Sequence, residues 1–118
     1  MSISRFEELI VWQKASVLAQ DVYRVTGTGD LRKDFGLRDQ MQRAAVSVMS
    51  NIAEGFERYN RREFRYFLSI ARGSAAEVRS QLHLARNLGY IGGEEFDRLL
   101  IGCVEITRML TSLRRSLD

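Results

Sequence analysis

Four segments of this sequence space their apolar residues three and four positions apart, the spacing that gathers them on one face of an α-helix. No proline stands anywhere in the chain, and proline is the residue that breaks or kinks a helix from inside. No segment alternates apolar and polar residues as a half-buried strand does. The chain is therefore constrained to fold into long helices that end at glycines and capping residues.

The apolar stripes indicate where each helix lies. The first stripe spans Val11–Val25 and the second Leu37–Ile52, with a break at Thr26–Asp30 that we expect to be the most flexible loop. The third stripe spans Phe64–Ala85 and the fourth Phe96–Leu117. The turns after the second and third segments are short, which makes consecutive helices antiparallel. We predict an all-α fold, an antiparallel up-down-up-down four-helix bundle.

Signals at the helix ends support this division. Ser4 with Glu7, and Asn60 with Glu63, have the spacing of a capping box, which satisfies backbone N–H groups at a helix start. Gly89 follows the third stripe, where a left-handed residue would close the helix. The sequence therefore predicts a helix start after each box and a helix end at Gly89.

Length and composition narrow the class of protein. The 118 residues fit one domain, residues 1–118. Hydrophobic residues make up 45% and charged residues 28%, enough for one core and a well-solvated surface. No apolar run approaches the ~18 residues of a membrane span, and the N-terminus lacks the pattern of a secretory signal. The single cysteine, Cys103, cannot form an intramolecular disulfide, so we expect a reducing cytoplasm and no membrane partner.

A regular row of arginines runs through the third helical segment and its approach. Arg58, Arg65, Arg72, Arg79 and Arg86 recur every seven residues, a spacing that drifts only ~20° per repeat on a helix. If Arg58 joins the helix, the row is about 40 Å long at ~1.5 Å per residue. All but two of the 18 basic residues are arginine, a bias that a GC-rich genome would also produce.

The surroundings of this row favour nucleic acid. Arg61 and Arg62 add positive charge at its first end, and Tyr59 and Tyr66 lie among the arginines. Guanidinium groups bind phosphate bidentately, and aromatic rings stack on bases. We interpret these seven arginines as a surface for RNA or another nucleic acid. The alternative is a solvated flank whose arginines pair with acidic residues of a neighbouring helix or subunit.

Small residues line another face of the same helix. Ser69, Gly73, Ala76 and Ser80 point away from the apolar stripe, and small side chains let a second helix approach closely. Glycine costs ~1 kcal/mol relative to alanine in a helix interior, so Gly73 suggests a packing role. We predict that this face, together with Trp12 of the first helix, lies at an oligomer interface. The alternative places Trp12 at the edge of the core of a single subunit.

Polar residues next to the second and third stripes form a further set. We interpret them as an interhelical hydrogen-bond network that fixes the register of the two helices, with pairs such as Arg43 with Glu77 or Glu54 with Arg58. A catalytic role for the carboxylates of Glu54 and Glu77 is the weaker alternative. The residues of the set are Gln40, Arg43, Ser47, Asn51, Glu54, Ser74 and Glu77.

Nothing in the sequence favours an enzyme. His83 is the one histidine and Cys103 the one cysteine, too few for a metal site built from these residues. We expect His83 to be solvated and Cys103 to be buried and inert. Gly27 and Gly29 do not precede the Lys-Ser or Lys-Thr pair of a phosphate-binding loop. We therefore expect no catalytic residues, no metal and no cofactor.

Several stretches resemble, in order and over nearly the whole chain, the four-helix-bundle family of proteins encoded within intervening sequences of bacterial 23S ribosomal RNA. Two positions depart from the family pattern. Gly29-Asp30 replaces a Phe-Pro pair, and Met49 stands where proline is frequent, which predicts a straighter second helix. The stretches are Phe6–Ala15, Phe35–Gln40, Arg43–Ser47, Asn51–Arg58, Phe64–Leu68, Ala71–Ser74 with Glu77, and Leu88–Tyr90.

The resemblance implies a limited set of properties. Members are similar in fold, tend to form pentameric rings and lack an assigned enzymatic activity. A related group serves as accessory subunits that bind the reverse transcriptases of diversity-generating retroelements and their template RNA. The link to ribosomal RNA genes concerns where the gene lies and does not itself prove RNA binding.

Two functions follow as hypotheses. The first is a non-enzymatic, ring-forming RNA-binding protein, a homopentamer by the resemblance. The second is a protein-interaction subunit, such as a reverse-transcriptase accessory protein, and the two are compatible in the retroelement case. Binding through arginines should weaken steeply with salt, whereas a packed protein interface is less sensitive.

Overall fold

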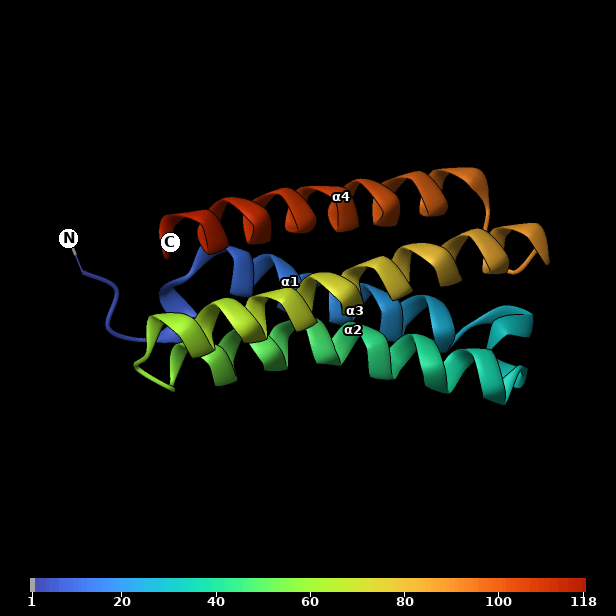
Figure 1. Ribbon diagram of the computed structural model, residues 1–118. Coiled ribbons are helices and arrows are strands. Elements are labelled where there is room, and N and C mark those ends of the chain that lie inside the picture. Colours follow the sequence, from blue (N-terminus) through green and yellow to red (C-terminus); the bar gives the residue numbers. More distant parts are fainter. Residues whose placement is uncertain (1) are drawn as a thin grey trace.

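The computed structural model describes residues 2–118 and confirms the all-α prediction (Figure 1). Helices and turns account for the regular structure of this part of the chain, without a strand. The bundle measures 44 × 22 × 20 Å along its principal axes. In chain order, the elements are the 3₁₀ helix η1 (Phe6–Glu8), α1 (Ile10–Thr26), the 3₁₀ helix η2 (Gly29–Lys33), α2 (Phe35–Phe56), α3 (Arg61–Asn87) and α4 (Gly93–Ser116).

Each long helix packs against two neighbours. Helix α3 lies between α2 and α4 on one side of the bundle, and α1 closes the other side between the same two helices (Figure 1). Helices α1 and α3 therefore stand at opposite corners. None of the helices in residues 2–118 is long and apolar enough to cross a lipid bilayer.

The four predicted stripes meet in the core. Their central members, such as Val22, Val48, Val78 and Ile106, are at most 1% exposed, and each large apolar side chain buried this way stabilises the fold by about 1.5–3 kcal/mol. The stripe members that stay partly exposed lie toward the ends of the bundle. They are Leu37, Phe64, Phe67, Leu113 and Leu117.

The closest helix contact lies between α2 and α3 at Gly55. A Cβ atom added to Gly55 would lie 2.7 Å from Cβ of Phe67 and 3.0 Å from Cδ1 of Phe64. Both phenylalanines belong to α3, so only a residue without a side chain lets the two helices meet here. Gly73 differs, because a Cβ atom added there would meet no atom within 4 Å.

We predict that Gly55→Ala lowers the free energy of unfolding by about 1–3 kcal/mol, because the added methyl group overpacks the α2–α3 contact. Gly73→Ala is the matched control. It should leave stability unchanged or raise it by up to ~1 kcal/mol, because alanine favours helix and the site is open. Thermal and urea denaturation followed by circular dichroism measures both, and equal stability of the two variants would contradict the close contact.

The helix ends agree with the sequence in two places. Asn60 caps α3 by accepting a hydrogen bond from the backbone N–H of Glu63 at 3.0 Å. Gly89 has φ +77°, and the N–H of Tyr90 donates to the carbonyl of Ala85, which together close α3 as a Schellman motif.

The predicted capping box at the N-terminus is wrong by one residue. Glu8, not Glu7, accepts hydrogen bonds from Ser4 and from the backbone N–H of Arg5 at 2.9–3.1 Å. These bonds lower the pKa of Glu8. The box opens the short helix η1, and α1 begins only at Ile10. The sequence signal marks a helical turn and does not distinguish a 3₁₀ turn from an α-helix.

The expected flexible loop after α1 is held in place at both ends. Thr26 is fully buried and its hydroxyl donates to the carbonyl of Val22 at 2.7 Å. Leu31 of η2 is also fully buried. The loop therefore packs against the bundle, because a single leucine after the glycines anchors it, which glycine content alone does not reveal.

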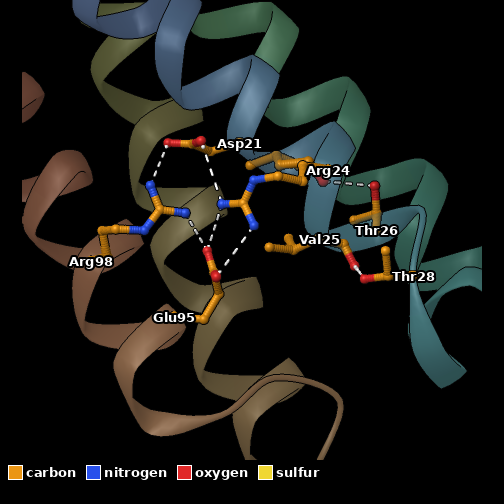
Figure 2. Close-up of polar contacts among 8 residues, drawn as sticks. Asp21, Arg24, Val25, Thr26, Thr28, Glu95 and Arg98 are labelled. Carbon is orange, nitrogen blue, oxygen red and sulfur yellow. Dashed lines mark hydrogen bonds and ion pairs between the residues drawn. The ribbon is translucent and has the colours of Figure 1, made fainter.

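Four charged side chains join the end of α1 to the start of α4 (Figure 2). Glu95 contacts both Arg24, at 2.7 Å, and Arg98. Asp21 lies between the same two arginines, 3.2 Å from Arg98 and 3.5 Å from Arg24. The arginine side chains are about half exposed, so water screens the pairs and each contributes little stability.

Candidate nucleic-acid interface

The arginine row lies along the seam between α3 and α4. Arg65, Arg72, Arg79 and Arg86 belong to α3, whereas Arg58 lies in the turn before it. Arg58 therefore does not continue the helical row. Each of the four helical arginines sits beside the core stripe on the flank of α3 that faces α4.

Contacts with α4 and the residues after it fix the row to this seam. Arg65 forms an ion pair with Asp118 at 3.0 Å, and Arg72 donates a hydrogen bond to the hydroxyl of Thr111 at 3.2 Å. The guanidinium of Arg86 lies over the ring of Phe96, 5.0 Å from its centre. These contacts hold three of the four helical arginines in place along the seam.

The middle and the far end of the row carry uncompensated charge. Within residues 2–118, no carboxylate oxygen lies within 4.0 Å of Arg72, Arg79 or Arg86, and all three residues are exposed. Arg65 has Asp118, and Arg58 has Glu54 at 2.9 Å and Glu63 at 3.8 Å. The alternative to nucleic-acid binding is that the arginines pair with acidic residues. Within this chain, such pairing applies to Arg58 and Arg65 but not to Arg72, Arg79 and Arg86.

The N-terminal end of α3 adds charge and aromatic surface. Arg61 donates to the carbonyl of Ser116 at 3.3 Å, and Arg62 is exposed. The rings of Tyr59 and Tyr66 are open to solvent, with the residues 78% and 63% exposed. Tyr59 has φ 52°, a left-handed conformation that costs ~1–3 kcal/mol for such a residue. The N-terminal end of α3 and the turn before it therefore carry two open rings and four arginines, Arg58, Arg61, Arg62 and Arg65.

The small-residue stripe is an open surface in the protomer. Ser69, Gly73, Ala76 and Ser80 are all exposed along the outer face of α3. Trp12 lies elsewhere, on α1, half-buried with its ring 5.2 Å from that of Phe6. The structure thus brings the four small residues together but not Trp12, and the oligomer interface stays a prediction.

The polar set divides into a bonded part and an open part. The hydroxyls of Ser47 and Ser74 hydrogen-bond across the α2–α3 seam at 2.8 Å. Asn51 donates to both the carbonyl and the hydroxyl of Ser47. Glu54 forms the expected ion pair with Arg58.

The expected pair of Arg43 with Glu77 does not form, since their charged atoms are more than 4.0 Å apart. Instead Gln40, Arg43 and Glu77 line an open groove beside the serines. Gln81, one turn after Glu77, also lines it. Sequence reasoning missed Gln81, although its spacing of four residues from Glu77 puts it on the same face.

Cys103 lies under the row, fully buried in α4. Burial raises the pKa of the Cys103 thiol to about 12, and the nearby charge of Arg79 opposes this rise. A thiol in this state is protonated at neutral pH and cannot act as a nucleophile. In residues 2–118, no three His, Cys, Asp or Glu side chains gather where a metal ion could bind.

We predict that Cys103 of the native protein reacts with Ellman's reagent at pH 8 much more slowly than in 6 M guanidinium chloride, because the native thiol is buried and protonated. The shift also makes stability pH-dependent. The stabilising effect of the neutral thiol is complete below its unfolded pKa of 9 and is lost as the pH rises toward 12. Rapid labelling of the native protein would contradict the buried position.

The comparisons with known proteins place this bundle in a class. The chain matches the family described as 23S rRNA-intervening sequence protein over residues 7–112. The protein belongs to this family, and the resemblance drawn from the sequence is confirmed.

A solved structure supports the same assignment. It is the 1.70 Å crystal structure of a protein with unknown function from the S23 ribosomal protein family of Bacteroides thetaiotaomicron, which is similar to this chain with a TM-score of 0.81 and 26% sequence identity. The match covers 89% of this chain and 98% of the other. No curated protein matches the chain.

Proposed function

We propose that this protein is a non-catalytic RNA-binding protein that holds RNA phosphates along the α3–α4 seam. The observation that carries the proposal is the uncompensated charge of Arg72, Arg79 and Arg86, which lie in one row without a carboxylate partner. Phosphate oxygens are the acceptors that guanidinium groups bind best. Neutralised phosphates release counterions, and this release supplies most of the affinity of such surfaces.

The end of the row at Tyr59 and Tyr66 supports single-stranded or looped RNA. An exposed ring that stacks on an unpaired base contributes ~1–3 kcal/mol. Arg62 and Tyr66 line the same hollow at this end of α3, and Arg62 would hold an adjoining phosphate. Paired bases are stacked on each other and could not use these rings.

Homo-oligomerisation is part of the proposal. Family members tend to form pentameric rings, and a ring would repeat the row once per subunit. Several weak contacts to one RNA then act as one strong contact through avidity. The small-residue stripe of α3 is one candidate surface for this assembly.

We expect that replacing Arg72, Arg79 and Arg86 by glutamine weakens RNA binding at least tenfold and makes the dependence of log affinity on log salt shallower by about 2, at ~0.7 per phosphate of a single strand. The matched control removes the same charge elsewhere, as Arg32→Gln, Lys33→Gln and Arg108→Gln. Fluorescence anisotropy at two salt concentrations measures binding, and light scattering checks that the oligomer is intact. An equal loss in the control, or no binding by the wild type at low salt, would contradict the proposal.

A protein-interaction subunit, such as an accessory protein of a reverse transcriptase, is the second candidate function. A hollow of about 270 Å³ between α1 and α4 has an apolar lining that includes Val17, Ile101 and Gly102. Val17 is 55% and Ile101 65% exposed. Exposed apolar patches of this kind favour a protein partner.

Ile101→Glu tests this second candidate. It should abolish association with a protein partner or with further copies of the chain, while RNA binding to the row persists. Analytical ultracentrifugation of the variant alone and with a reverse transcriptase measures the effect. Unchanged association of the variant in both experiments would exclude this surface.

A further inference from the structure

A second groove, between α2 and α3, is built from polar side chains that the proposed phosphate surface does not use. It is open on one side and has a volume of about 260 Å³. Its polar lining consists of Gln40, Arg43 and Ser47 from α2 and of Ser74, Glu77 and Gln81 from α3.

At one end of this groove, the polar side chains already hydrogen-bond to one another. Ser74 is 5% exposed and hydrogen-bonds to Ser47 at 2.8 Å, and Asn51 holds Ser47 through two further bonds. The hydroxyls and the amide bond one another, so this end does not need a ligand. It instead fixes the spacing of the two helices where the groove opens.

The rest of the groove has hydrogen-bonding capacity that nothing in residues 2–118 fills. Oε1 of Gln81 is buried and accepts no hydrogen bond. Arg43 on α2 and Glu77 on α3 each lack an oppositely charged group within 4.0 Å. A buried acceptor without a donor from the protein is uncommon, and a water molecule or a ligand group would fill it.

The two charged groups define the shape of that partner. A guanidinium presents two parallel N–H donors, and a carboxylate presents two acceptors, both in a plane. A planar ligand that engaged both groups would offer two adjacent acceptors on one edge and two adjacent donors on another. Gln81, as a further acceptor, favours a ligand with an additional N–H group.

Guanine is the RNA base with this arrangement. Its N7 and O6 are the paired acceptors that arginine binds bidentately, and its N1–H and N2–H₂ are paired donors for a carboxylate. Adenine sets a donor beside an acceptor on these edges, and cytosine and uracil have no paired donors. The volume of about 260 Å³ is below the ~300–1,000 Å³ typical of sites for larger ligands, which suits one base with its ribose outside.

The groove and the arginine row flank the same helix. Counting around α3, the residues between them are Ser69, Gly73, Ala76 and Ser80, all exposed. Their small side chains keep this side of α3 narrow, on a helix about 10–12 Å across. Where the stripe faces solvent, which is the alternative to its predicted place at an oligomer interface, a strand whose phosphates lie on the row has a short path over it to the groove.

We propose that the α2–α3 groove binds one unpaired guanine base, with Arg43 donating to N7 and O6 and Glu77 accepting from N1–H and N2–H₂. The biological setting of this inference rests on the proposed function. The inference deepens that function, because it names the base that RNA bound on the row would present. The base site itself binds guanosine without the row.

Nucleosides without phosphate test the groove independently of the row. In an NMR titration of the ¹⁵N-labelled protein, guanosine should shift the Gln81 side-chain amide and the backbone amides of Ser47 and Ser74. Inosine, which lacks the N2 amino group, should bind roughly tenfold more weakly, and adenosine should cause no shift. Glu77→Gln and Arg43→Gln should each abolish the guanosine shifts, while Glu57→Gln and Arg32→Gln, outside the groove, should preserve them.

A second measurement separates this inference from the proposed function. A uridine strand with one central guanosine should bind the wild type roughly tenfold more tightly than an all-uridine strand, and Glu77→Gln should remove only this preference. Equal binding of both strands with no guanosine shift would overturn the guanine site and leave RNA binding on the row intact. If guanosine causes the shifts but neither strand binds, the guanine site is supported and RNA binding on the arginine row is contradicted. Guanosine shifts that persist in folded Glu77→Gln and Arg43→Gln would also overturn the site.

Discussion

The close approach of α2 and α3 at Gly55 is the contact on which the arrangement of this bundle depends. Because no side chain separates the helices there, the aromatic rings of Phe64 and Phe67 pack directly on α2. In the same antiparallel register, Ser47, about two helical turns before Gly55 in α2, hydrogen-bonds to Ser74 of α3. Beyond that hydrogen bond Arg43 and Glu77 line the polar groove without pairing.

Helix α3 carries most of the surface that we connect with function. Its core stripe is buried between α2 and α4, and the two flanks that remain differ in chemistry. The flank toward α4 carries Arg72, Arg79 and Arg86, whose charge is uncompensated within the protomer. The flank toward α2 carries the polar side chains of Ser74, Glu77 and Gln81. On our two proposals, the first flank would hold RNA phosphates and the second would hold one base.

The fold could be predicted from the sequence nearly in full, because each helix has its own periodic stripe and its own end signals. Asn60 and Gly89 close the ends of α3 by local bonds that span only a few residues, which is why local spacing identifies them. The N-terminal box failed at Glu7, and the glycine-rich loop proved to be anchored by Leu31. The first prediction was wrong because local spacing does not distinguish a 3₁₀ turn from the start of an α-helix. The anchoring of the loop depends on the packing of Leu31 against the bundle, which local spacing does not encode.

The sequence by itself determined the helices, the core positions, the family and the heptad spacing of the arginines, since all of these are properties of one chain segment at a time. Only the tertiary structure decided which charges are free. Asp118 pairs with Arg65 although 53 residues separate them, whereas Arg43 and Glu77 do not pair. Pairing depends on which residues α2 and α4 bring opposite α3, and that register is set by packing between helices, which the spacing within a single helix does not encode.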